Sequence, residues 1–150
     1  MRPTVAEQLQ GIGRILAEVV APEVTSGYPA EILRGAIGAL NALGAAWTRV
    51  PAFLVWDIES TTNVLAAALP LLSGVVADAV RETLAHPVDS ADWAALEDRQ
   101  HHVRGLLVQA MPAILDQPRD GEAYRLMTTL FRERADRFPF QMSAQPVKKP

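Results

Sequence analysis

The middle of this chain is almost free of charge, and this restricts the folds available to it. Between Gly35 and Ala77 only Arg49, Asp57 and Glu59 are charged, whereas Asp78 to Arg137 contains nineteen acidic or basic residues, histidine excluded. A segment this apolar has to be buried on several sides. The longest uncharged stretch, Ser60 to Ala77, includes Thr61, Thr62, Asn63 and Pro70, so it falls short of the roughly 20 mainly apolar residues that a membrane span requires.

The spacing of apolar residues predicts helices. Thr4 and Glu7 fit a capping box, in which the hydroxyl and the carboxylate satisfy each other's backbone donors. A row on a 3.6-residue period follows, at Val5, Leu9, Ile12, Leu16 and Val19. A second helix is predicted with Pro29 as its first residue, and it carries an apolar row at Leu33, Ile37, Leu40, Gly44 and Trp47. Its other side carries the small residues Gly35, Gly38, Ala42 and Ala45, so this helix is apolar nearly all round.

Further helices are expected along the rest of the chain. We expect Asp57 to cap a third helix that ends at Pro70, and Asp89 or Ser90 to cap the longest one, over 93–114. Other helices are predicted over 74–85 and 122–137. No segment alternates with the period of a strand. The sequence therefore predicts an all-α single domain of five or six helices over 1–138, with a flexible tail over 139–150.

Composition argues against several classes of function. The net charge of −3 and the pI near 5.6 provide no general attraction for nucleic acid or anionic lipid, so we expect neither as a partner. The chain has no cysteine, which removes disulfides, thiolate nucleophiles and cysteine-bound zinc. Neither a P-loop nor a Gly-x-Ser-x-Gly elbow occurs. No cofactor is predicted. The acidic Glu7 near the start argues against a signal peptide, and we expect a cytoplasmic protein.

The three histidines are candidate metal ligands. His101 and His102 are adjacent on the predicted long helix, where side chains diverge by about 100° per residue and do not readily close on one ion. We therefore expect a charged face and no metal site there. His86 stands at a helix end, where an imidazole is expected to cap exposed carbonyls.

The stretch Trp56 to Asn63 is the strongest candidate for a ligand site. It places two carboxylates, three hydroxyls and an amide against the most apolar part of the chain, a mixture typical of a pocket. Glu59 and Asn63 share a helical face, and Glu59 in a dry cleft would suit proton transfer. Helix capping by Asp57 and a first-turn position for Glu59 explain both acids without function. Further candidate lining residues are Tyr28 and Trp47.

Two hypotheses of function follow. The first is a non-catalytic binding or accessory protein that forms homo-oligomers through its apolar central helices or holds a small apolar molecule or a partner protein. The second is an enzyme with Asp57 or Glu59 as its acid–base group. The alternative to an oligomer is that neighbouring helices of the same chain cover the apolar central helix.

Overall fold

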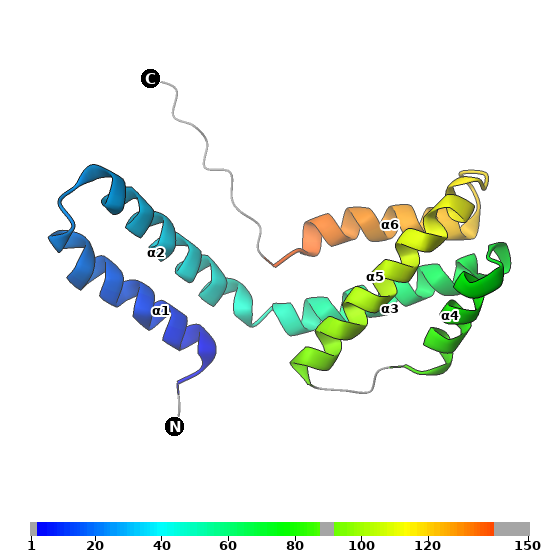
Figure 1. Ribbon diagram of the computed structural model, residues 1–150, viewed down its shortest axis with the longest axis horizontal. Helices are drawn as coiled ribbons and strands as arrows, with labels where there is room; N and C mark the ends of the chain where they lie inside the picture. The colour runs from blue at the N-terminus through cyan, green and yellow to red at the C-terminus, as the bar shows by residue number, and fades with distance from the viewer. Residues whose placement is uncertain (1–2, 88–91, 140–150) are drawn as a thin grey trace, which may run out of the picture. The chain divides into compact units, whose positions relative to one another are not determined.

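The protein is all-α, as its apolar periodicity predicts. The computed structural model describes residues 3–87 and 92–139, and this part of the chain contains six α-helices and no strand (Figure 1). The helices are α1 (Val5–Ile15), α2 (Gly27–Trp47), α3 (Val50–Ala68), α4 (Gly74–Ala85), α5 (Trp93–Leu115) and α6 (Glu122–Arg137).

The described residues fall into two compact units. The first joins α1 and α2 and ends at Val50, with Pro139 added from the far end of the chain; the second runs from Pro51 to Phe138. Apart from Pro139, the predicted tail lies outside the described residues.

The first unit is a helical hairpin. Its predicted capping box is confirmed: the Glu7 carboxylate accepts from the Thr4 N–H at 2.7 Å, and the Glu7 N–H donates to the Thr4 hydroxyl at 3.3 Å. A π-helical turn (Leu16–Val20) and a short 3₁₀ turn (Ala21–Glu23) lead into α2, which runs antiparallel to α1 (Figure 1).

Two glycines let the hairpin helices approach closely. A β-carbon built on Gly44 would lie 3.3 Å from the Ala6 carbonyl oxygen, and one built on Gly13 would lie 2.8 Å from the Asn41 amide oxygen. Glycine at these two positions therefore permits this spacing without displacing the neighbouring atoms.

The second unit begins with α3, which starts earlier than the sequence indicates. The prediction that Asp57 caps this helix is wrong, because α3 already begins at Val50 and Asp57 lies in its interior. Pro51 is tolerated in the first turn, where its missing N–H has no helical acceptor. The helix ends at Ala68, before Pro70, as predicted.

The second unit also contains the hydrophobic core. The expected caps of α5, Asp89 and Ser90, lie outside the described residues, and the N-cap position is Asp92. The fully or nearly fully buried core side chains come from all four helices of this unit: Val64, Leu65, Ala68, Val80, Val103, Leu106, Leu107, Ala110, Ile114, Ala123, Met127 and Leu130. Over the described residues, no helix combines the length and the apolar character that crossing a bilayer would need.

Candidate functional site

A hollow of about 240 Å³ lies against α3, α4 and the start of α5. Glu59 and Asn63, which the sequence places on one helical face, both line it. The full lining is Ile58, Glu59, Thr62, Asn63, Thr83, Leu84, Pro87 and Arg99. Glu59 is exposed, so its carboxylate is not in the dry cleft that proton transfer would favour. The hollow combines apolar walls with one carboxylate and one guanidinium.

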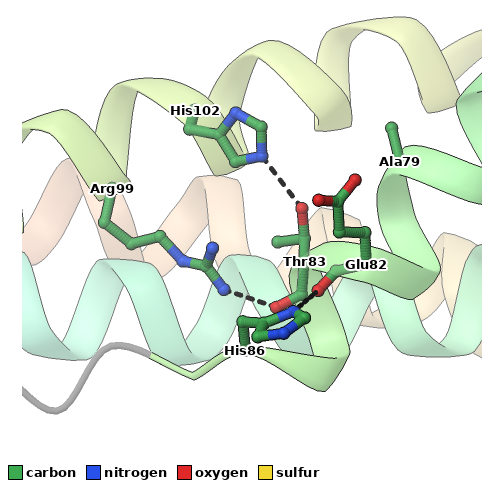
Figure 2. A pocket seen from close by; sticks show the side chains of 6 residues that line it. All are labelled: Ala79, Glu82, Thr83, His86, Arg99 and His102. Atoms are coloured by element: carbon green, nitrogen blue, oxygen red, sulfur yellow. Dashed lines mark hydrogen bonds between the residues drawn. The ribbon is translucent and has the colours of Figure 1, made fainter.

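A second hollow, of about 220 Å³, shares Thr83 and Arg99 with the first (Figure 2). His102 of α5 reaches across to α4, where its Nε2 lies 2.9 Å from the Thr83 hydroxyl. His86 Nδ1 lies 2.9 Å from the Glu82 carbonyl oxygen, which confirms the expected cap at the end of α4. The shared Arg99 donates from Nη2 to the Thr83 carbonyl at 2.6 Å.

The adjacent histidines point to different surroundings. Both side chains are exposed, but His102 contacts Thr83 of the neighbouring helix. Within residues 3–87 and 92–139, no group of three or more histidine or acidic side chains is close enough to hold a metal ion. The contact from His102 to α4 was not foreseen, because helix periodicity does not say which neighbour a side chain meets.

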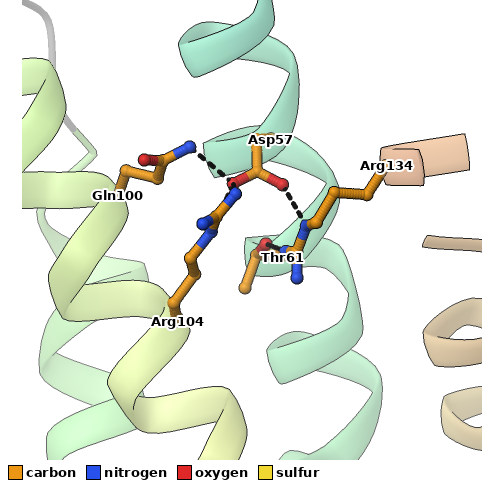
Figure 3. Close-up of polar contacts among 5 residues, drawn as sticks. All are labelled: Asp57, Thr61, Gln100, Arg104 and Arg134. Carbon is orange, nitrogen blue, oxygen red and sulfur yellow. Dashed lines mark hydrogen bonds and ion pairs between the residues drawn. The ribbon is translucent and has the colours of Figure 1, made fainter. Parts of the chain in front are cut away.

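Asp57 is the centre of a buried ionic cluster (Figure 3). Its side chain is completely enclosed. Arg134 of α6 donates from Nε to Oδ1 at 2.6 Å, and Arg104 of α5 donates from Nε to Oδ2 at 2.8 Å. Gln100 adds an amide donor to Oδ2 at 2.8 Å, and Arg134 Nη2 also bonds the Thr61 hydroxyl at 2.9 Å. Both carboxylate oxygens are thus occupied by donors from the protein.

One feature of the sequence could have indicated this cluster. Gln100 stands in the apolar row of the longest helix, and a polar side chain on a buried row needs a hydrogen-bond partner. Arg104 and Arg134 carry no comparable signal, because arginine on a helix is usually a surface residue. Only the packing of α3, α5 and α6 brings their guanidinium groups to Asp57.

The remaining candidates from the sequence lie elsewhere. Trp56 neighbours Asp57 in the chain but lines neither hollow; its ring lies 4.7 Å from the guanidinium carbon of Arg137, a cation–π contact, and 5.9 Å from the Phe53 ring. Tyr28 and Trp47 belong to α2 in the first unit. Tyr28 is 75% exposed and Trp47 is half-buried. The predicted pocket residues therefore lie in four places: the hollow, the ionic cluster, the contact of Trp56 with Arg137 and Phe53, and α2.

The hairpin of the first unit carries a set of exposed apolar side chains among the described residues. The apolar row of α2 lies along its contact with α1, where Leu33, Ile37, Leu40 and Trp47 are half-buried and Gly44 is buried. Beside this seam, both helices expose large apolar side chains. We call these residues the hairpin face: Val5, Ile12, Ile15 and Val19 with Tyr28, Ile32 and Leu43.

Helical geometry places these side chains on one side of the hairpin. At 100° per residue, the exposed residues of α1 lie roughly 130° around the helix from the residues of α1 that contact α2, and the exposed residues of α2 lie at a similar angle from its own contact residues. Because the two helices are antiparallel, both rotations turn the exposed side chains toward the same side of the hairpin. The charged side chains Arg14 and Arg34 lie on the opposite side, and Gln10 and Asn41 lie at the edge of the contact seam, where they meet Gly44 and Gly13. The charged residues of the two helices thus lie away from the hairpin face, although Gln8 stands among its α1 residues.

The sequence matches no protein-family model, and comparison with curated proteins and with solved structures gave no match.

Proposed function

We propose that this protein is a non-catalytic binding protein that self-associates through the hairpin face. The observation that carries the proposal is the separation of apolar and charged side chains on the hairpin. The charged groups Arg14 and Arg34 stand on the side opposite Ile12, Ile32 and Leu43. Monomeric proteins rarely leave contiguous apolar patches of several hundred Å² open unless another molecule covers them.

The first unit also needs further burial for its own stability. Its buried described residues are Gly13, Gly44, Ala46, Val50 and Pro139, so no large aromatic or long aliphatic side chain is fully enclosed. Ordering a backbone costs about 1–2 kcal/mol per residue, which contacts between small residues do not offset over two helices. Covering the hairpin face would supply the missing apolar burial.

A second copy of this chain is the occupant that we propose. The seven side chains of the hairpin face are each between 38% and 75% exposed, and a standard interface buries about 800 Å² per partner. Two such faces related by a two-fold axis would form a four-helix arrangement with Ile12, Ile32 and Leu43 inside. The proposal keeps the cytoplasmic location expected from the sequence.

The enzyme hypothesis has less support. The Asp57 carboxylate is fully enclosed and is bound by two arginines and an amide, which leaves no route to a substrate. Glu59 is exposed to solvent and forms no ion pair among the described residues. Binding therefore accounts for the geometry better than acid–base chemistry does.

Sedimentation of charge variants tests the proposal. We expect the wild-type chain at micromolar concentration to sediment at twice its 16.3 kDa, and Ile32→Asp to sediment as a single chain. Ala45→Asp is the matched control, because it places the same charge on the opposite side of α2, and it should remain dimeric. A single-chain mass for the wild type, or a dimeric Ile32→Asp, would contradict the proposal.

A second measurement covers the case in which Ile32→Asp does not fold. The chain has no cysteine, so Leu43→Cys provides a unique site for a spin label. Pulsed electron paramagnetic resonance should then find a defined distance between labels on two copies. Absence of dipolar coupling in a folded, labelled protein would argue against this face as the dimer contact.

A further inference from the structure

Arg99 is a half-buried cation that lacks a carboxylate partner. Its Nη2 donates to the Thr83 carbonyl at 2.6 Å, and its Nε is buried with no hydrogen-bond acceptor. Among the described residues, no acidic oxygen lies within 4.0 Å of this guanidinium. Arg104, five residues later on the same helix, is paired with Asp57 at 2.8 Å. Arg99 is thus a guanidinium without an acidic partner among the described residues, and because its Nε is enclosed, a ligand would bind it through Nη1 and Nη2.

The hollow beside Arg99 offers complementary chemistry for a small molecule. Ile58, Leu84 and Pro87 supply apolar wall, and Glu59 supplies a negative charge on the α3 side. Asn63 adds an amide that both donates and accepts hydrogen bonds. A ligand that satisfies all of these groups at once has an anionic end, a cationic end and an apolar branch.

We propose that this hollow binds a free α-amino acid with an aliphatic side chain. Arg99 binds the ligand carboxylate, because a planar guanidinium matches a carboxylate through two parallel hydrogen bonds. Glu59 binds the ammonium group, and the aliphatic side chain packs on Ile58, Leu84 and Pro87. A simple dianion such as phosphate fits less well, because the Glu59 carboxylate would repel it.

The size of the hollow agrees with a ligand of this class. Its volume of about 240 Å³ lies below the roughly 300–1,000 Å³ of pockets for drug-sized molecules. The neighbouring hollow of Figure 2 fits this ligand less well, because it is lined by two histidines and Glu82 with Ala79 as its one aliphatic side chain. The site uses only residues of the second unit, so it is independent of self-association through the hairpin face.

Calorimetric titration with L-leucine tests the site. We expect saturable binding by the wild-type chain, with affinity reduced about tenfold or more in Arg99→Gln and in Glu59→Gln, the loss typical of one charge-assisted contact. Glu97→Gln is the control, since Glu97 is an exposed carboxylate of α5 outside the hollow, and it should bind as the wild type does. 4-Methylpentanoate, which lacks the ammonium group, should bind about tenfold more weakly than leucine.

Amide chemical shifts provide a readout that needs no variant. Leucine should shift the amide resonances of residues 58–63 and 83–87. Absence of binding at millimolar leucine, shifts confined to other residues, or equal affinity for leucine and 4-methylpentanoate would overturn the proposal.

Discussion

Arg134 and Asp57 are joined across 77 positions of the sequence by a hydrogen bond of 2.6 Å from Nε to Oδ1. The bond ties α6 to α3, while Arg104 and Gln100 tie α5 to the same carboxylate. Three of the four helices of the second unit therefore meet at one enclosed anion. Buried charges are tolerated only when they are paired and hydrogen-bonded, and here both oxygens meet that condition.

Asp57→Asn should destabilise the second unit strongly. The substitution keeps the shape of the side chain but removes the negative charge, so the Arg134 guanidinium, whose side chain is 19% exposed, loses its counter-charge. Breaking a buried pair from one side typically costs about 3–5 kcal/mol. Arg104 is 35% exposed and contributes less, because water screens it. The free energy of unfolding from urea titration measures the effect.

Asp78→Asn is the matched control for that experiment. Asp78 pairs with Arg81 on the surface of α4, with both side chains more than half exposed. Exposed pairs contribute about 0–1 kcal/mol, so the variant should unfold close to the wild type. Equal losses of unfolding free energy in the two variants would show that the buried Asp57 pairs stabilise the protein no more than the exposed Asp78 pair does.

Gly44→Ala should weaken the hairpin, although alanine favours helices. The new methyl group would meet the backbone oxygen of Ala6 at 3.3 Å, and a backbone oxygen moves only if α1 moves with it. Gly38 lies on the same helix, where an added β-carbon has nothing within 4 Å. Gly38→Ala should therefore gain up to about 1 kcal/mol from helix propensity. We expect the two variants to differ by at least about 1 kcal/mol in thermal or urea unfolding, with Gly44→Ala the less stable, and the reverse order would contradict the close approach.

The N-terminus of α1 should respond to acid through Glu7. The backbone N–H of Thr4, and then its hydroxyl, donate to the Glu7 carboxylate and lower its pKa below the ordinary value. A carboxyl with a lowered pKa in the folded state stabilises that state above its ordinary pKa, and this contribution is lost as the pH falls through the lowered value. Carbon-13 titration of the Glu7 carboxyl measures the pKa directly. In Glu7→Gln, the helical circular dichroism of α1 should lose this acid-dependent step, and a Glu7 pKa at or above the ordinary value would contradict the capping box.

Thermal stability should depend on protein concentration if the hairpin face pairs two copies. Association that favours the folded state raises the melting temperature as concentration rises. Ile12→Asp should remove that dependence, because its charge would have to be buried in the contact. Val75→Asp is the control, since Val75 is 85% exposed on α4 and outside the hairpin face. Melting curves over a hundredfold range of concentration distinguish the two variants, and a concentration-independent wild type would contradict pairing.

Local features of this protein follow from the sequence alone. The capping box at Thr4, the end of α3 before Pro70, the cap at His86 and the shared face of Glu59 and Asn63 all depend on residues within one or two helical turns of each other. Their physics is local: backbone donors at a helix end, the missing N–H of proline and the 100° turn per residue. The all-α class follows from the same periodicity.

Tertiary structure decided what each polar side chain does. A helical pattern shows that Asp57 and Gln100 share faces with apolar residues, but it does not show which helices pack together, so the arginines that reach Asp57 stay unidentified. Capping was the simpler interpretation of Asp57, and it failed because Pro51 can stand in the first turn of a helix that begins at Val50. The hairpin face also depends on tertiary structure. The apolar content of α2 is evident in the sequence, but which side of α2 stays exposed depends on the close approach of the two helices at Gly13 and Gly44. Long-range pairing of faces is set by the fit of whole helices, and no short segment contains that information.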